Sequence, residues 1–210
     1  PNYSQAGNGD VIEIPNLPNL ERWANASNVQ IQGYISAEYA RDWRQVKTID
    51  VTKHELAFEK YSMMVPIKNG RFQILNLLEE LDMPGEWYID KNTCKMFYYP
   101  SHNLRVGVDK LTIATLNSDF VNFKNASNIT LKGINFEENA SNGIVLDENS
   151  KNITISHCDL KNVGGIGVIV KGKNNLISGC RFEATSKRGA DLDGGDSATL
   201  THGNNEISNC

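Results

Sequence analysis

The chain has 210 residues, of which 40% are apolar and 22% are charged, and its formal net charge is -4 at pH 7. This is the composition of a globular protein, not of a disordered one. The acidic balance argues against a nucleic-acid partner, which needs a concentration of Lys and Arg. No apolar run approaches the length of about 18 residues that marks a membrane-spanning helix, so we expect no membrane span.

The first element that we predict is a coil of a parallel β-helix within residues 1–36. Residues 28–36 read NVQIQGYIS and match, position by position, the stretch NITLKGINF that begins at Asn128. The Asn and the Gly of the two stretches coincide in this alignment. Because equal patterns favour equal backbone paths in a repeat fold, the match indicates one coil before the chain leaves the repeat.

Residues 37–115 lack the repeat and predict an insertion made mostly of β-strands. They contain alternating stretches such as HELAF, EWYID and KMFYYP, together with one short helix-like run, ILNLLEEL. Alternation with a period of two residues is typical of strands. We expect this insertion to pack against the side of the β-helix.

Residues 116–210 contain a repeat of short alternating strands separated by Asn and Gly. The copies begin at Asn128, Asn152, Asn174 and Asn204, which lie 24, 22 and 30 residues apart. A unit of about 22–24 residues with about three short strands is the size of one β-helix coil. Asn and Gly tolerate the left-handed backbone that a sharp corner needs. We therefore predict an all-β parallel β-helix, whose coils we expect to continue beyond residue 210.

Equivalent positions of successive coils should stack about 4.8 Å apart. The four Asn residues that begin the copies would then stack at one corner, where their amides can bond to one another. Ile129 and Ile153 would stack in the core. Cys158, Cys180 and Cys210 would form an internal ladder of buried thiols, with a disulfide between adjacent coils as the alternative.

Several Asn residues also lie in N-x-[ST] sequons, among them Asn125, Asn128 and Asn152. Such sequons are glycosylation acceptors in a eukaryotic secreted protein. A chain this rich in Asn, Ser and Thr also makes sequons by chance, and the predicted corner explains the Asn residues without any glycan.

Three stretches carry a resemblance to a known group of proteins. They span Arg22–Trp43, Asn76–Pro100 (with PGEWY and FYYP) and Gly189–Asn209. Together they resemble large secreted right-handed parallel β-helix proteins, which include β-helix glycoside hydrolases of the β-xylosidase and α-fucosidase/xylanase type. Cys94 departs from the pattern, because relatives more often carry Gly there. The resemblance implies a right-handed helix, a secreted protein and a carbohydrate as partner.

Acidic residues gather near one strand of the last coils. If Ala190 and Leu192 point inward, Asp191 and Asp193 point outward on one face. Asp196 follows in an insertion of about eight residues relative to the preceding repeat, His202 follows that insertion, and Asp147 falls in the column of Asp193 two coils away. Glycoside hydrolysis needs two carboxylates, one as an acid and one as a base or nucleophile. Asp193, Asp191 and Asp196 are therefore the candidate catalytic residues, with the acid and base roles left open.

Substrate contacts would come from His202, Asp147 and Trp43, the last in the polar stretch RDWRQ. Sugar rings stack on exposed aromatic side chains, although the aromatic residues of the insertion could equally form its own core. We expect no cofactor for a hydrolase.

A non-catalytic carbohydrate-binding or structural module is the first alternative. A Ca²⁺-dependent polysaccharide lyase is the second, because the same acidic residues could hold Ca²⁺. The sequence leaves the oligomeric state open.

Overall fold

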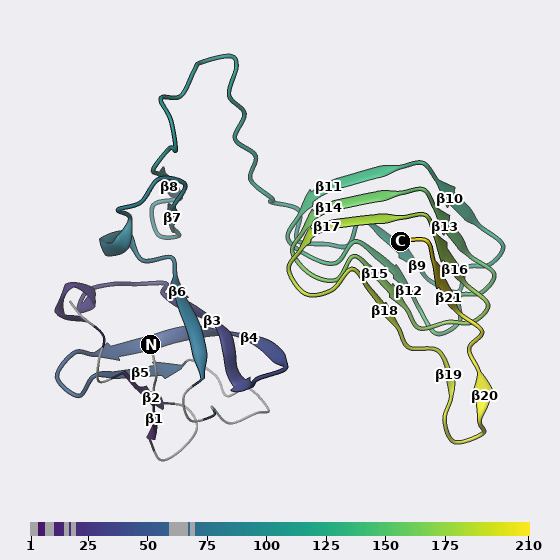
Figure 1. Ribbon diagram of the computed structural model, residues 1–210, viewed down its shortest axis with the longest axis horizontal. Coiled ribbons are helices and arrows are strands. Elements are labelled where there is room, and N and C mark those ends of the chain that lie inside the picture. The colour runs from purple at the N-terminus through teal and green to yellow at the C-terminus, as the bar shows by residue number, and fades with distance from the viewer. Residues whose placement is uncertain (1–3, 7–10, 15–16, 18–19, 59–66, 68–69) are drawn as a thin grey trace. The chain divides into compact units, whose positions relative to one another are not determined.

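The chain folds as an all-β protein with two compact units (Figure 1). The computed structural model describes residues 4–6, 11–14, 17, 20–58, 67 and 70–210. The first unit is Pro1–Asp109 and the second is Lys110–Cys210. Among the described residues the helices are two short 3₁₀ turns, η1 (Leu20–Trp23) and η2 (Leu78–Glu80). The predicted all-β fold class is confirmed.

A six-stranded antiparallel sheet with the order β1-β2-β5-β4-β3-β6 forms most of the first unit. Its strands are β1 (Ser4–Ala6), β2 (Val11–Glu13), β3 (Gln30–Ala37), β4 (Ala40–Asp50), β5 (Glu55–Phe58) and β6 (Arg71–Leu75). Alternate residues of β3, such as Ile31 and Ile35, are fully buried in the core of this unit. A separate hairpin follows, made of β7 (Trp87–Asp90) and β8 (Lys95–Tyr98).

The coil that we expected within residues 1–36 is wrong for residues 30–36. β3 pairs antiparallel with both β4 and β6, whereas strands of a coil pair parallel with their neighbours. Gly33 is needed because β6 approaches closely: a Cβ there would lie 2.1 Å from the carbonyl oxygen of Arg71. Gly133, its supposed equivalent, instead adopts a φ of 66° at a corner. The two similar sequence stretches therefore adopt two different backbone conformations.

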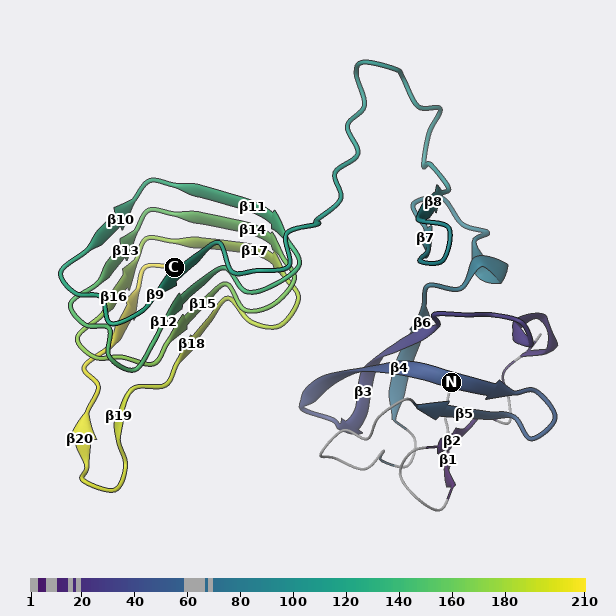
Figure 2. The same cartoon turned by 180° about the vertical axis from the view of Figure 1, so that it is seen from behind.

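The second unit is a parallel β-helix, in which successive coils stack into three sheets (Figures 1 and 2). The first sheet contains β9 (Val121–Phe123), β12 (Ile144–Leu146), β15 (Val168–Val170) and β18 (Ala190–Leu192). The second contains β10 (Thr130–Lys132), β13 (Thr154–Ser156), β16 (Leu176–Ser178) and β21 (Glu206–Ser208). The third contains β11 (Asn135–Asn139), β14 (Asp159–Val163) and β17 (Arg181–Thr185). The predicted parallel β-helix is therefore confirmed.

Each coil turns at corners that hold left-handed backbone. The predicted Asn corner is confirmed: Asn128, Asn152, Asn174 and Asn204 all have φ between 51° and 58°. The Asn152 amide donates to Oδ1 of Asn128 at 3.1 Å, and the Asn204 amide donates to Oδ1 of Asn174 at 3.3 Å. Two further columns of corner residues also have positive φ. The first column contains Gly133, His157, Gly179 and Asn209, and the second contains Glu138, Asn162 and Ala184.

The interior of the coils is a continuous apolar core. Ile144, Leu146, Ile153 and Leu160 are no more than 1% exposed. Ile129 in the first coil and Leu192 in the last strand of the first sheet are 37% and 38% exposed, because each lies at an end of its stack. Burial of Ile153 agrees with the prediction, and that of Ile129 is incomplete.

The predicted ladder of thiols is confirmed for its inner members. Cys158 and Cys180 are buried and Cys210 is exposed, and all three are free thiols, as is the exposed Cys94. Burial raises the pKa of the Cys180 thiol. The disulfide alternative is therefore not the arrangement in this structure.

A pair of Asn side chains, Asn175 buried and Asn205 half-buried, continues the column that begins with Ile129 and Ile153. Asn175 is 2% exposed, and its Oδ1 accepts a hydrogen bond from the Ile153 backbone N–H at 3.0 Å. Its own N–H and amide donate to Oδ1 of Asn205 at 3.0 and 3.1 Å. The interior of this corner is therefore apolar in the first coils and lined by amide groups in the later ones. Each of these hydrogen bonds joins one coil to the next.

Ala184 offers a direct test of the strained corners. Its φ is 52° and its side chain is exposed, so Ala184→Gly removes strain without removing buried surface. Left-handed backbone costs a non-Gly residue about 1–2 kcal/mol, part of which is offset by the greater entropy of unfolded Gly. We expect a gain of about 0.5–1 kcal/mol in the free energy of unfolding, measured with denaturant. Ala198→Gly, at an exposed position outside the positive-φ set, should give no gain.

Candidate functional site

The candidate acidic residues lie on β18 and on the hairpin that follows it. Asp191 is in the middle of β18, in one column with Ile169 of β15. Asp193 comes directly after β18, and its backbone N–H donates to the Val170 carbonyl at 2.7 Å. Their Cα atoms are about 7 Å apart by strand geometry. Asp191 on β18 and Asp193 directly after it are thus neighbours in the chain, and their roles in catalysis stay a prediction.

The long insertion forms a hairpin of two short strands, β19 (Gly195–Asp196) and β20 (Thr201–His202). It projects from the corner between β18 and β21 (Figure 1). Both Asp196 and His202 are exposed on it. The hairpin is thus the feature of this corner that the preceding coils lack.

Two carboxylates of the cluster, Asp191 and Asp196, have side-chain or backbone partners. The Arg188 guanidinium binds Asp191 at 2.9 Å. Asp196 accepts hydrogen bonds from the Thr199 hydroxyl at 2.7 Å and the Ala198 N–H at 2.9 Å. The Thr199 hydroxyl is the main reason that the pKa of Asp196 is lowered. Asp196 is therefore held ionised, in contacts that stabilise the turn between β19 and β20.

Asp147 is separated from Asp193 by a cation. By register, the column one position beyond the first sheet reads Lys124, Asp147, Lys171 and Asp193. Two strand spacings of about 4.8 Å place Asp147 about 10 Å from Asp193, with Lys171 between them. Asp147 accepts hydrogen bonds from Ser150 Oγ at 2.7 Å and from the Asn125 N–H at 3.0 Å. It shapes the corner and joins two coils.

These contacts predict an acid-sensitive contribution of Asp147 to stability. The Ser150 hydroxyl is the main cause that lowers its pKa below 3.8. A carboxylate with a lowered folded pKa stabilises the fold above its unfolded pKa and loses that contribution as the pH falls through the folded value. Unfolding of Asp147→Asn, followed from pH 5 downward, should therefore depend less steeply on pH than that of the wild type. Equal slopes would contradict the role assigned to this carboxylate.

Trp43 lies in the other unit, on β4. Its side chain is 51% exposed, and its Nε1 donates to Oε1 of Gln30 at 3.2 Å. It is thus an exposed aromatic residue, as the sequence suggested, rather than part of the core of that unit. Its role as a sugar contact stays a prediction.

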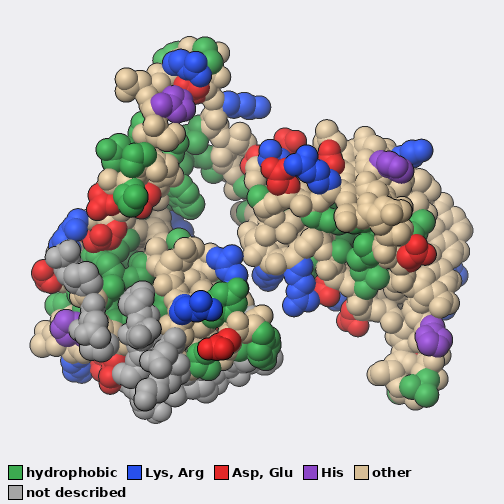
Figure 3. Space-filling model, in the orientation of Figure 1, with side chains coloured by type: hydrophobic (Ala, Val, Ile, Leu, Met, Phe, Trp, Pro, Cys, Tyr) green, Lys and Arg blue, Asp and Glu red, His purple; other side chains and the backbone are tan. Residues whose placement is uncertain are grey.

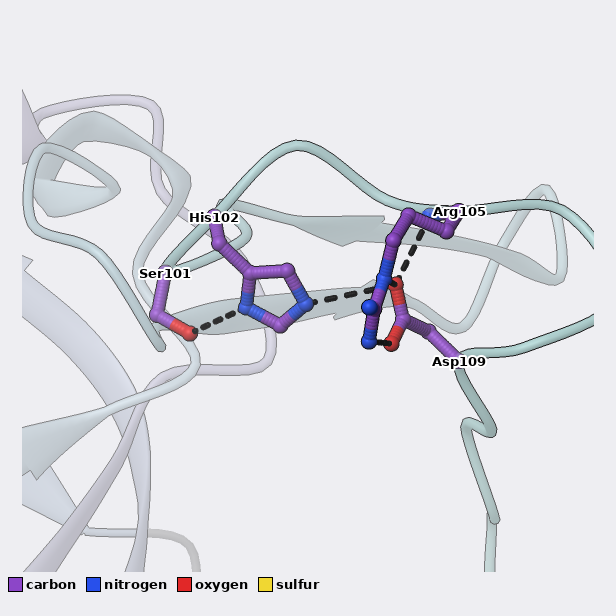
Figure 4. Close-up of polar contacts among 4 residues, drawn as sticks. All are labelled: Ser101, His102, Arg105 and Asp109. Atoms are coloured by element: carbon purple, nitrogen blue, oxygen red, sulfur yellow. Dashed lines mark hydrogen bonds and ion pairs between the residues drawn. The ribbon is translucent and has the colours of Figure 1, made fainter.

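A Ser–His–Asp contact that the sequence analysis did not identify lies on the surface loop at residues 101–109 (Figure 4). The Ser101 hydroxyl is 3.3 Å from Nδ1 of His102, and Nε2 of His102 is 3.2 Å from Asp109. Arg105 also binds Asp109, through its guanidinium at 2.9 Å and its N–H at 2.7 Å, and chiefly lowers the pKa of that carboxyl. A catalytic triad also needs a substrate pocket and oxyanion donors. With His102 56% exposed in its side chain, we interpret the contact as a clasp that closes the loop.

The sequon residues Asn125, Asn128 and Asn152 are all exposed. The Nδ2 atom of Asn152, where a glycan would be attached, already donates to Asn128. The corner ladder thus accounts for Asn128 and Asn152, and glycosylation stays a prediction.

The described residues contain neither a candidate metal-ion cluster nor a candidate membrane-spanning helix. Within the described part of the chain, no three His, Cys, Asp or Glu side chains gather as a metal site would require. The same residues include no helix that is long and apolar enough to cross a membrane. On the visible face of the β-helix unit, acidic and basic side chains are intermixed (Figure 3).

Comparisons with known proteins agree with this architecture. A family model described as "Right handed beta helix region" matches residues 88–210. A solved structure titled "Glycoside hydrolase" is similar with a TM-score of 0.58 and 12% sequence identity, over 86% of this chain and 50% of that one. The chain spans about half the length of that structure, and at this identity the likeness concerns the fold alone. No curated protein matches. Since the family model covers more than half of the chain, the protein belongs to the right-handed β-helix family.

Proposed function

We propose that this β-helix is carbohydrate-active and works as a glycoside hydrolase through Asp193 and Asp191. The observation that carries the proposal is the position of Asp191 on β18 and of Asp193 directly after it, next to the projecting β19–β20 hairpin. A rigid sheet that ends in a long loop is a common setting for sites. The distant structural likeness to a glycoside hydrolase supports the same class of reaction.

The contacts favour a division of roles between the two residues. Arg188 binds Asp191 at 2.9 Å, and a carboxylate fixed in an ion pair suits a base or nucleophile. Asp193 is then the residue that would protonate the leaving oxygen. Asp196 and His202 would contact the sugar from the hairpin. Because polysaccharides are extracellular substrates, we place the protein outside the cell.

A non-catalytic carbohydrate-binding module is the second candidate. The observation that favours it is the exposure of Asp193, together with the pairing of Asp191 with Arg188. A general acid usually requires burial or a second carboxylate beside it, and Lys171 rather than a carboxylate neighbours Asp193 in its column. The Ca²⁺-dependent lyase is less favoured, since no metal cluster forms among the described residues.

Asparagine substitution separates these candidates. If Asp193 is catalytic, Asp193→Asn should abolish most turnover of a neutral polysaccharide and preserve binding. If the protein binds carbohydrate without cleaving it, even the wild-type protein would show no turnover.

A further inference from the structure

A cleft of about 480 Å³ opens in the first unit, far along the sequence from the acidic strand. Its lining residues come mainly from the end of β6, from η2 and from the start of the β7–β8 hairpin. These elements follow one another in the chain (Figures 1 and 2). Ile74 and Leu77 supply apolar surface, and Trp87 comes from the hairpin. Small-molecule sites commonly have volumes of about 300–1,000 Å³ with mostly apolar walls, and this cleft has that size and character.

One side chain fixes the two walls of the cleft relative to each other. Oδ1 of Asn76 accepts a hydrogen bond from the Ile89 N–H at 2.9 Å, and its Nδ2 donates to the Asn28 carbonyl at 3.1 Å. Asn76 has a φ of 57°, a conformation that Asn tolerates better than most residues. The hairpin wall is therefore attached to the sheet, and the cleft is formed before any ligand arrives.

Trp87 presents a large aromatic surface in this cleft. Its side chain is 55% exposed, whereas the next residue, Tyr88, is 7% exposed and packs near Phe97 on the opposite side of the hairpin. Alternation along β7 thus directs one ring inward and the indole outward. An exposed indole in a concave site offers a flat apolar surface to a ring-shaped ligand.

The polar groups of the cleft include both acceptors and donors of hydrogen bonds and carry little net charge. Oε1 of Glu80 accepts from the Trp23 indole at 2.9 Å and pairs with Arg22 at 3.3 Å, which positions this carboxylate in the wall. Glu86 and Lys91 add one charge of each sign. The lining has no concentration of cations for an anionic ligand and too many polar groups for a purely apolar one.

We propose that this cleft is a second carbohydrate site, which binds a neutral oligosaccharide stacked on Trp87, with hydroxyl groups donating to Glu80. Trp43 extends the site, because its indole is bonded to Gln30, which lines the cleft. The choice of a sugar as ligand rests on the proposed function. The site itself uses none of the residues assigned to hydrolysis.

Titration calorimetry of the full chain with xylohexaose, cellohexaose and mannohexaose tests the proposal, with hexagalacturonate as the anionic comparison. We expect at least one neutral hexasaccharide to bind, and Trp87→Ala to weaken that binding about tenfold. Trp87→Tyr keeps a stacking ring and should lose less. The matched control is Tyr39→Ala, which removes an aromatic side chain that is 85% exposed and does not line the cleft.

Circular dichroism first establishes that each variant is folded; if Trp87→Ala is not, the comparison is made with Trp87→Tyr and with Glu80→Ala. The proposal is overturned if no neutral hexasaccharide binds, if folded Trp87 variants bind like the wild type, or if hexagalacturonate binds more tightly. Asp193→Asn distinguishes the two sites. Trp87-dependent binding without any hydrolysis removes the proposed catalytic function and retains this site, whereas hydrolysis without Trp87-dependent binding does the reverse.

Discussion

Gly167→Ala should lower the free energy of unfolding of the β-helix unit by about 3 kcal/mol. A Cβ at Gly167 would lie 2.4 Å from the Gly189 carbonyl oxygen and 2.7 Å from a ring carbon of Phe182. The backbone there also bonds the next coil, since the Gly167 N–H donates to Arg188 at 3.0 Å. Relief of the clash therefore requires two coils to separate, with loss of hydrogen bonds and of packing in the core.

The same close approach recurs along the column. A Cβ at Gly143 would lie 2.2 Å from the Gly167 carbonyl oxygen, so glycine is required by the spacing of the coils. Gly133→Asn is the matched control, because Gly133 has open space around it and its corner holds Asn209 at a φ of 54°. Denaturant unfolding should show a change within about 0.5 kcal/mol for this control. Equal stability of Gly167→Ala and the wild type would show that the coils tolerate a wider spacing.

Asp193→Asn should reduce kcat for the favoured neutral polysaccharide by about 10²- to 10⁴-fold, the usual contribution of a general acid or base. Asparagine preserves the shape of the side chain and cannot donate the proton that the leaving oxygen needs. The dissociation constant for oligosaccharide should stay within about threefold, because an amide still bonds hydroxyl groups. Reducing-sugar assays give kcat, and calorimetry gives binding.

Asp159→Asn is the control for this substitution. Asp159 is an exposed carboxylate on β14, in a different sheet of the same unit, and its loss should leave kcat unchanged. If both variants lose activity equally, a general effect of charge or stability is responsible. If neither loses activity, Asp193 is not the catalytic acid.

The repeat could be predicted from the sequence because equivalent positions of stacked coils carry similar residues at regular intervals. The Asn residues that begin each copy share a backbone conformation, and their side chains bond in two pairs, Asn128 with Asn152 and Asn174 with Asn204. Cys158 and Cys180 are buried at one repeated position for the same reason. Cys94, where relatives more often carry Gly, has a φ of 54°. Glycine adopts this left-handed conformation most readily.

What the sequence could not predict depends on neighbours that are distant in the chain. β3 carries the letters of a coil strand, but its partners are antiparallel strands that approach at Gly33. The cleft at Trp87 is formed by three segments that hydrogen bonds of Asn76 hold together, and no repeat or motif spacing in the sequence indicates it. The partners of Asp191 and Asp196 likewise come from local turns whose geometry is not evident before the fold is known.

The most direct test of the central claim is the release of reducing ends from neutral polysaccharide, followed by NMR and ultraviolet absorbance of the products. A glycoside hydrolase that works through these carboxylates should release saturated sugars in the presence of a chelator, and Asp191→Asn/Asp193→Asn should release none. Unsaturated products that require Ca²⁺ would identify a lyase instead. No release by the wild type, or equal release by the double variant, would contradict the assignment of Asp191 and Asp193.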